Sequence, residues 1–355
     1  MTTLYILDQY EKVIGVMDNR LQDGLHYFDD LLTTKLEYGY MDFAFSVRLD
    51  HSQMINIQKE HHIVVPDEDG KKLLFRIKTV KQDIKNNRLN VWCEGSASTD
   101  LLSAVVRPFK LSSTSAENAL NVVLSNTDWK LGQIDYLGIK DVDFTDYTNA
   151  FSSVQEIASL FNGELEYEVI FDGLKVSKKI VHLLTRRGQD TKKLFQFNLD
   201  IAGIEVIEDT KQLFTAIIPV GKKGNGEPLT LTGYTPSFIE GGFEKQADWI
   251  GSKEAFKMYH LNGRHRFYYW KDEKAQSQAE LYRNGLAMLK KISRSNDTHN
   301  MEVVLLERVT GLEAHKVRLG DTVRMDKPSG LLEARVNTWV RSLTDRKKSN
   351  VSLVT

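Results

Sequence analysis

The chain has 355 residues, of which 41% are hydrophobic and 27% are charged, and its 47 basic residues almost balance 48 acidic ones for a net charge of −1. This composition excludes intrinsic disorder, and the length predicts two to four domains. The charge balance argues against a duplex-DNA-binding protein, and no stretch approaches the about eighteen apolar residues of a membrane-spanning helix.

The N-terminal section is predicted to consist of strands. Residues 41–49 alternate apolar and polar side chains, which indicates a strand with one solvated face. The polar turn 66–70 separates two apolar runs and predicts a hairpin, and the polar turn 85–87 returns the chain into another strand. The predicted strands are residues 4–7, 13–17, 41–49, 63–65, 73–80 and 89–93.

The next hundred or so residues predict a compact mixture of helices and strands. Thr114 to Glu117 fits a capping box, in which the threonine hydroxyl accepts from the Glu117 amide while the glutamate reaches back. Ser153 to Glu156 repeats this pattern, and Gly163 is the expected stop of the second helix. Asp172-Gly173 predicts a hairpin between strands at 165–171 and 174–184.

From residue 201 the sequence returns to strands, at 204–207 and 213–220, followed by a glycine-rich turn. After an aromatic stretch, a long helix is predicted from Asp272 to about Ser293. Its apolar stripe consists of Ala275, Ala279, Tyr282, Leu286 and Leu289. The last fifty or so residues again have strand patterns.

These patterns predict four domains. They are a β-domain at 1–98, an α+β domain at 99–200, a second β-domain at 201–240 and 301–355, and a peripheral aromatic and helical domain at 241–300.

The two strand-rich ends of the chain resemble each other. Arg76-Ile77-Lys78-Thr79 matches Arg335-Val336-Asn337-Thr338, and an acidic turn closed by glycine precedes each. A strand that opens with Asn-Val follows each, 14 residues beyond Arg76 and 15 beyond Arg335. The similarity predicts a duplication, although turn residues and period-2 patterns make any two hairpins look alike. A real repeat gives each chain two similar β-domains, so three chains around an axis would place six in a ring.

Few residues have the surroundings that catalysis or metal binding requires. Cys93, the one cysteine, lies within a predicted strand and is interpreted as a buried thiol, not as a nucleophile. His61 and His62 are adjacent on a strand and point to opposite faces, so they cannot chelate one metal together. His260 and His265 lack the helix of a zinc protease. We predict no catalytic residue, no metal site and no cofactor.

Four other patterns have both a structural and a functional interpretation. Glu164, Glu166 and Glu168 share one strand face, which is interpreted as solvated. The turn 221–226 has no helix behind it, which favours a hairpin loop over a phosphate-binding loop. The aromatic run 267–270 predicts a strand with alternate rings in the core or a subunit interface, although such rings also stack on sugars or bases. The segment 316–348 has nine basic and four acidic residues, which face solvent, a neighbouring subunit or an acidic tail component.

The order of these motifs along nearly the whole chain resembles the phage tail family called prophage endopeptidase tail, or phage minor structural protein N-terminal region. Each piece alone is common in β-proteins, and the order and spacing carry the resemblance. The matching positions are Arg76 and Thr79 in the first hairpin, Gly188 and Asp190 in the run 185–190, Pro219 and Gly221 at the end of the strand 213–221, Gly320 and Asp321 in the run 317–323, and Arg335, Val336 and Thr338 in the last hairpin.

This resemblance implies the trimeric hub fold of phage tail tips and baseplates. The fold class is α+β and β-rich, a multidomain hub-like fold with two similar tube-type β-domains plus α+β insertions. In the implied role, a ring of three copies joins the tail tube to the host-recognition apparatus and provides a channel. The implied partners are further copies of the chain, the tail-tube or distal tail protein, the tape-measure protein and receptor-binding or tip proteins, with DNA as passing cargo and no membrane insertion.

The resemblance also implies a bacteriophage virion, at the tail tip or baseplate, as the location of the protein. We expect no secretory signal and therefore synthesis in the bacterial host cytoplasm. Two other function classes stay open: a tail-associated peptidoglycan endopeptidase, which the family name suggests, and a carbohydrate-binding tail adhesin that uses the aromatic stretch.

Overall fold

The computed structural model describes residues 2–195, 201–223, 227–272, 275, 277–294, 296–303, 317–327, 330–345 and 348–354. The chain forms two compact units. The main unit contains residues 1–205 and 299–355, and the inserted unit contains residues 206–298. Both copies of the predicted repeat lie in the main unit, and so does the candidate functional site.

Seven strands form the first β-unit of the main unit. They are β1 (Leu4–Leu7), β2 (Val13–Met17), β3 (Tyr27–Lys35), β4 (Met41–Arg48), β5 (His62–Pro66), β6 (Lys72–Asp83) and β7 (Arg88–Gly95). The order β6-β7-β4-β3 forms one sheet, and β5 pairs with both β6 and β1. Strand β3 was not predicted, because Asp29 and Asp30 interrupt its apolar pattern; Asp29 has a φ of 49° and lies at an irregularity in the pairing with β4.

An α+β insertion follows within the main unit. It contains α1 (Ser96–Leu102), β8 (Val105–Val106), β9 (Phe109–Ser115), α2 (Ala116–Leu124), β10 (Trp129–Ile134), β11 (Ile139–Phe144), β12 (Thr148–Asn149), α3 (Ala150–Phe161), β13 (Glu164–Phe171) and β14 (Val176–Leu184). The last two strands are the hairpin predicted at Asp172-Gly173.

Both helix caps in this insertion differ from the prediction. The cap of α2 is Ser115, whose hydroxyl accepts from the Asn118 amide, because the helix starts at Ala116, directly after Ser115. The cap of α3 is Asn149, which accepts from the Ser152 amide, so Ser153 lies inside the helix. A polar residue with strand geometry directly before the helix is the better cap in each case.

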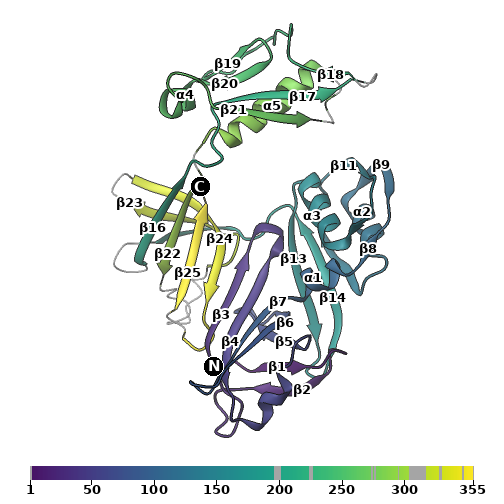
Figure 1. Cartoon of the computed structure of the whole chain (residues 1–355), viewed down its shortest axis with the longest axis vertical. Coiled ribbons are helices and arrows are strands. Elements are labelled where there is room, and N and C mark those ends of the chain that lie inside the picture. Colours follow the sequence, from purple (N-terminus) through teal and green to yellow (C-terminus); the bar gives the residue numbers. More distant parts are fainter. Residues whose placement is uncertain are drawn as a thin grey trace. The chain divides into compact units, whose positions relative to one another are not determined.

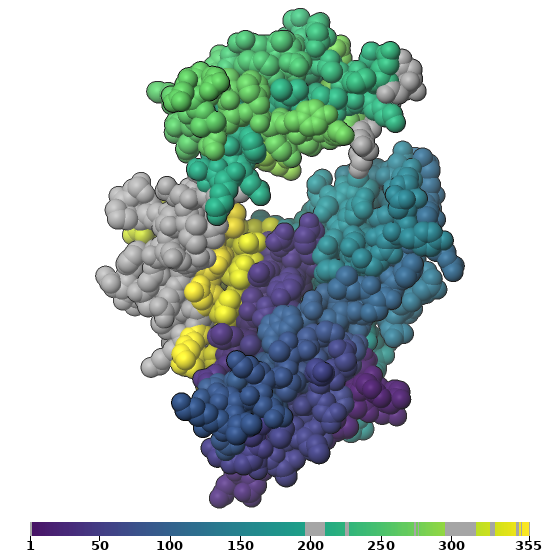
Figure 2. All heavy atoms as spheres, viewed as in Figure 1, coloured from purple at the N-terminus to yellow at the C-terminus, as the bar shows by residue number. Residues whose placement is uncertain are grey.

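The second β-unit contains β15 (Asp190–Phe195), β16 (Ile201–Asp209), β22 (Asn296–Val303), β23 (Thr322–Lys327), β24 (Gly330–Arg341) and β25 (Ser349–Val354). Strands β16 and β22 continue into the inserted unit, at residues 206–209 and 296–298. The order β24-β25-β22-β16 continues the sheet of the first β-unit, and β23 pairs with β24 and β15. This unit has its own apolar core, which includes Phe195, Val323, Met325, Val336, Trp339, Val351 and Leu353. Figures 1 and 2 show its yellow strands beside the purple strands of the first β-unit.

The two β-units are similar at the level of single residue pairs. The three strands β5-β6-β7 correspond to β23-β24-β25, with Arg76 equivalent to Arg335. Four positions beyond the arginine, Val80 lies opposite Val91, and Trp339 lies opposite Val351. The facing pairs of residues 76–82 with β7 thus correspond one to one to those of residues 335–341 with β25.

A shared irregularity strengthens this correspondence. The register of β6 against β7 shifts at Lys78, and the register of β24 against β25 shifts at Asn337. These two residues occupy the same position in the repeated segments. Because two unrelated hairpins have no reason to carry a bulge at the same position, the duplication is preferred over a chance resemblance.

The inserted unit contains β17 (Ala216–Lys222), β18 (Pro228–Leu229), β19 (Phe243–Gln246), β20 (Trp249–Ser252), α4 (Lys253–Tyr259), β21 (Phe267–Asp272) and α5 (Gln278–Ile292). The predicted helix therefore starts six residues later than expected, because 267–272 is a strand and Ser277 caps α5 by accepting from the Glu280 amide. Alternate rings of β21 pack as predicted: Tyr268 and Trp270 contact the core, and Phe267 and Tyr269 are exposed.

Strand β17 lies in the inserted unit, whereas its residues were predicted for the second β-domain, 201–240. It pairs with β20 and, in parallel, with β21, and Ile217 is buried with Ile250 and Leu281. Its apolar residues therefore find their partners within 206–298. Of the glycine-rich turn, residues 224–226 lie outside the described residues; on either side of them, Lys222 pairs with Pro228 in a hairpin.

Two glycines allow β15 to join β23. Gly188 and Gly320 have φ values of 71° and 88°, and a Cβ on Gly188 would lie 2.2 Å from the carbonyl carbon of Gly320. The Asp321 carboxylate accepts from the Gln189 amide at 2.8 Å, and Gln189 in turn accepts from the Thr322 amide. Only glycine combines this backbone conformation with this close approach.

We predict that Gly188→Ala lowers the free energy of unfolding by about 3 kcal/mol, because it adds a backbone collision to left-handed strain. The control is Gly70→Ala, at a φ of 84° with no atom within 4 Å of the added Cβ. It should cost only about 1 kcal/mol. Urea denaturation measures both, and equal losses would contradict the close contact.

Candidate functional site

The two β-units meet where β24 pairs with β3, and polar contacts of several kinds surround this joint. Residues 338–341 of β24 pair antiparallel with residues 32–35 of β3, and the Leu36 amide donates to the Asn337 carbonyl at 2.8 Å. This pairing converts two separate sheets into one continuous sheet.

Asp30 of β3 fastens the chain where it leaves β24. Its buried carboxylate accepts from the Ser342 hydroxyl at 3.0 Å and from the Thr344 amide at 3.2 Å. It also accepts from the Leu343 amide and the Thr344 hydroxyl. A carboxylate with this many donors is fully compensated for its burial, so Asp30 holds the joint and is not a reactive acid.

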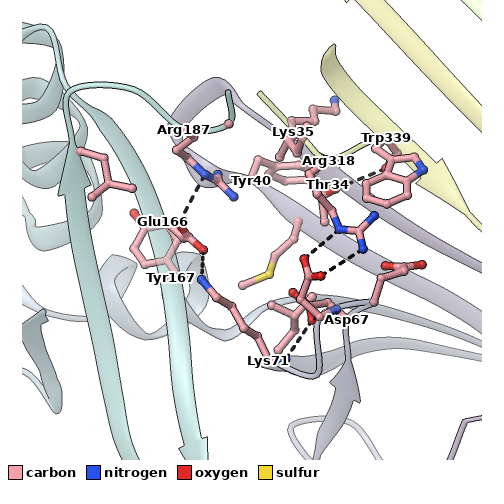
Figure 3. Close-up of a pocket in the computed structure, with 18 of the residues that line it drawn as sticks. Thr34, Lys35, Tyr40, Asp67, Lys71, Glu166, Tyr167, Arg187, Arg318 and Trp339 are labelled. Carbon is pink, nitrogen blue, oxygen red and sulfur yellow. Dashed lines mark hydrogen bonds and ion pairs between the residues drawn. The ribbon is translucent and has the colours of Figure 1, made fainter. Parts of the chain in front are cut away.

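A cavity of about 260 Å³ lies beside the joint. It is lined by the end of β3 with residues 39–41, by the turn 67–71 between β5 and β6, and by β13 with residues 184–188. Arg318, Leu319, Trp339 and Arg341 of the second β-unit complete the lining. In Figure 3, Arg318 lies beside Trp339 and points to the turn, while Lys71 and Arg187 both approach Glu166.

Ion pairs fill the side of the cavity that joins the β-units. Arg318 forms two hydrogen bonds to the Asp69 carboxylate, of 2.8 and 3.0 Å, and Arg341 lies 2.8 Å from Glu68. Both guanidinium groups also lie over the ring of Trp339, at 5.8 and 4.3 Å from its centroid. Paired and stacked arginines tolerate burial, which explains how Arg341 can be only 2% exposed.

The α+β insertion contributes a second set of ion pairs. Glu166 of β13 lies 2.7 Å from Lys71 and 3.8 Å from Arg187. Burial would raise the pKa of Glu166, but Arg187 and Lys71 together hold it below its usual range. Burial also lowers the pKa of Arg187, and the neighbouring carboxylates of Glu166 and Glu164 oppose this effect.

Arg335 forms the densest contact of the site. Its guanidinium binds both oxygens of Glu164, at 2.5 and 2.8 Å, and donates to the carbonyls of Gly320 and Arg187 at 2.7 and 2.6 Å. Burial would raise the pKa of Glu164, but Arg335 holds it below its usual range. A bidentate pair of this kind fixes distance and orientation, so the second β-unit is held against the insertion.

The equivalent arginine of the first β-unit is also bound to the insertion. Arg76 donates to the Asp100 carboxylate of α1 at 2.5 Å, and Lys179 of β14 donates to the same carboxylate at 2.8 Å. Lys179 also pairs with Glu11. Burial raises the pKa of Asp100, but Lys179 and Arg76 outweigh it and hold that pKa below its usual range.

Of the positions identified from the sequence, one group comes together. Gly188, Asp190, Gly320, Asp321 and Arg335 surround the contact between β15, β23 and β24. Val336 lies in the core of the second β-unit and Thr338 faces Lys35 in the joint. The remaining positions lie elsewhere: Arg76 and Thr79 in β6, and Pro219 and Gly221 in the inserted unit.

Sequence reasoning missed the acidic half of the site. The face of Glu164, Glu166 and Glu168 is not simply solvated, because each carboxylate has a basic partner, with His182 at 3.4 Å from Glu168. Arg318, Arg324, Arg335 and Arg341 of the basic segment likewise have carboxylate partners within the chain. Its residues Lys316, Arg346 and Lys347 lie outside the described residues. The sequence did contain a signal for these ion pairs. Residues 316–348 have five more basic than acidic residues, an excess that favours carboxylate partners elsewhere in the chain.

The described residues contain neither a metal-ligand cluster nor an exposed cysteine. They contain no group of three or more side chains able to hold a metal ion. Cys93 is completely buried, as predicted, and burial raises the pKa of its thiol. Within the same residues, no helix has the length and apolar character needed to cross a bilayer.

The fold is similar to that of solved prophage tail proteins. The prophage tail protein gp18 from Listeria monocytogenes EGD-e has a TM-score of 0.60 at 13% identity, with 100% of this chain and 94% of that chain covered. The tail protein from Neisseria meningitidis MC58 has a TM-score of 0.63 at 9% identity, covering 100% and 96%. The 43 kDa tail protein of prophage MuSo2 from Shewanella oneidensis has a TM-score of 0.63 at 10% identity, covering 99% and 98%.

Family models give the same assignment. The model described as prophage endopeptidase tail matches residues 189–354, and the model described as prophage endopeptidase tail domain matches residues 103–179. Residues 103–179 and 189–354 thus belong to prophage endopeptidase tail families. Among curated proteins, none matches the chain.

We predict that Arg335→Met lowers the free energy of unfolding by about 3 kcal/mol, because it leaves the partly buried Glu164 without its bidentate partner. Arg324→Met is the matched control in the same β-unit, since Arg324 makes only 3.3 Å contacts to the more exposed Asp190 and Glu333. Its loss should stay below about 1 kcal/mol. Chemical denaturation measures both, and similar losses would argue against a special role for Arg335.

His62 gives the main unit a sensitivity to acid. It is completely buried, its Nδ1 contacts the Asp8 carbonyl, and burial lowers its pKa to about 4. Because the unfolded chain binds this proton near pH 6.5, the stabilisation is complete above that pH and is lost as the pH falls towards 4.

We therefore predict that wild type loses roughly 2 kcal/mol between pH 7 and pH 5 through this group. His62→Met should remove that part of the pH dependence, whereas His26→Gln, at an exposed histidine, should retain it. Urea denaturation at several pH values is the measurement. An unchanged pH dependence in His62→Met would refute the assignment.

Proposed function

We propose that this protein is a structural hub of a bacteriophage tail tip or baseplate, in which three copies form a closed ring. The observation that carries the proposal is the duplication: one chain contains two β-units with the same strand register and the same bulge. Three such chains supply six similar β-units, which matches a six-fold tail tube to a three-fold tip. Closed cyclic assembly is the common way in which homo-oligomers terminate.

In this role the ring contacts the tail-tube or distal tail protein on one side and receptor-binding or tip proteins on the other. Its inner wall forms the channel for the tape-measure protein and then for DNA, which passes without being bound as a ligand. The near balance of 47 basic and 48 acidic residues supports a channel that does not retain DNA. The protein then resides in the virion.

The pairing of the polar residues with one another supports a structural role over an enzymatic one. The carboxylates and arginines at the joint are engaged with one another, as in Arg335 with Glu164 and Arg318 with Asp69. Catalytic groups need a free face toward a substrate. The peptidoglycan endopeptidase suggested by the family's name has no comparable support among the described side chains.

A carbohydrate-binding tail adhesin is the second candidate, and one observation favours it. Phe267 and Tyr269 of β21 are 44% and 56% exposed on one face of the inserted unit. Exposed rings of this kind stack on sugars. Binding of cell-wall glycans by the wild type, lost in a Phe267→Ser/Tyr269→Ser variant, would support it.

The hub proposal predicts a complex of three times the 40.6 kDa of one chain. Native mass spectrometry of the protein over a range of concentrations measures this, together with copy counting in isolated tails. Zymography on peptidoglycan should show no clearing. A tail that contains a number of copies other than three, or clearing that a single substitution abolishes, would contradict the proposal.

A further inference from the structure

We propose that residues 79–82, at the open edge of β6, pair with β16 of a second copy of this chain, in the register that β24 uses for β3. This inference rests on the proposed ring and specifies which strands close it. The structure supplies its own template, because the joint between the two β-units is a contact between the same two kinds of strand.

The template fixes the residues of β6. In the joint, residues 338–341 of β24 pair with β3. Since Arg76 is equivalent to Arg335, these residues correspond to Thr79, Val80, Lys81 and Gln82. Beyond Ile77, which bonds to residues 60 and 61, β6 has only β7 as a strand partner among the described residues. One row of backbone donors and acceptors is therefore left open.

Residues 338–341 of β24, which β3 covers, and residues 79–82 of β6, which are open, differ in the exposure of their side chains. In β24, Trp339 and Arg341 are 4% and 2% exposed. In β6, Thr79, Lys81 and Gln82 are all exposed. The open edge is polar, which protects an isolated chain from indiscriminate strand pairing and leaves the specific partner to be selected by shape and charge.

Strand order identifies β16 as the partner strand. The first β-unit has the order β7-β4-β3 and the second has the order β25-β22-β16, so β16 is equivalent to β3. Both strands have nine residues, and both are followed in their units by a strand of eight, β4 or β22. Whereas β3 is covered by β24, β16 is the last strand of the sheet in the described part of the chain.

Charge favours the same pairing. By sequence, β16 contains Glu205, Glu208 and Asp209 and no basic residue, while residues 79–82 contain Lys81 and no acidic residue. Because the edges of β6 and β16 differ, each chain presents its β6 edge to one neighbour and its β16 edge to the other. Such a head-to-tail contact generates a ring when the rotation closes.

The test is a disulfide across the proposed contact. The joint pairs Thr338 with Lys35, and the equivalent residues are Thr79 in β6 and, with β3 and β16 aligned at their ends, Asp209 in β16. The double variant Thr79→Cys/Asp209→Cys of the full chain is oxidised over a range of concentrations and run on non-reducing gels. The native Cys93 is buried and does not interfere.

Two control variants match it. Thr338→Cys/Lys35→Cys tests the same geometry within one chain and should form an intrachain disulfide. Thr79→Cys/Glu208→Cys shifts the contact by one residue, which turns the second side chain to the opposite face. We expect at least about tenfold more interchain product from the proposed pair than from the shifted pair, with species of up to three chains. A mixture of the two single variants should stop at two chains.

The outcomes separate this inference from the hub proposal. If copies assemble but the proposed pair gives no more interchain product than the shifted pair, the strand pairing is wrong and the hub stands. If three-chain assemblies are absent from isolated tails as well, both fail. Cross-linking in the proposed register supports the inference even when the free chain is mostly monomeric, because oxidation traps transient contacts.

Discussion

The antiparallel contact between β24 and β3 is the constraint on which the main unit depends. A strand pair by itself specifies register only weakly, and this one places buried charges such as Arg341 and Asp30 next to the backbone. Each of these charges is satisfied by a group from the other β-unit, Glu68 for Arg341 and residues 342–344 for Asp30. A shifted register would leave both without partners, which costs several kcal/mol per charge. The charges therefore select one alignment.

The two arginines of the repeat show how a duplicated unit was adapted. Arg76 and Arg335 occupy the same position, and both bind a carboxylate of the α+β insertion, but from different elements: Asp100 in α1 and Glu164 in β13. The insertion is thus held by equivalent points of both β-units. This explains why an arginine persists in both copies while most of their other residues differ.

How far the sequence could predict this structure depended on whether a pattern is local. Strands β1 and β2 were predicted with the correct ends, and Cys93 was correctly expected to be buried, because alternation and turn residues are local signals. The repeat was visible because it preserves residue identities. Strand β3 was missed because its irregularity at Asp29 disrupts the alternation, and β17 was misassigned because its partners lie far along the sequence. The ion pairs of β13 were invisible for the same reason.

The inserted unit lies between β16 and β22, where the first β-unit has only the short connection of residues 36–40 between β3 and β4. Hairpin tips accept insertions because the chain enters and leaves at neighbouring points. In a ring of three chains, six β-units line the wall but only three carry this addition. In the proposed ring, the duplication would thus supply a near six-fold arrangement of β-units and the single insertion a three-fold one, so one chain would carry both symmetries.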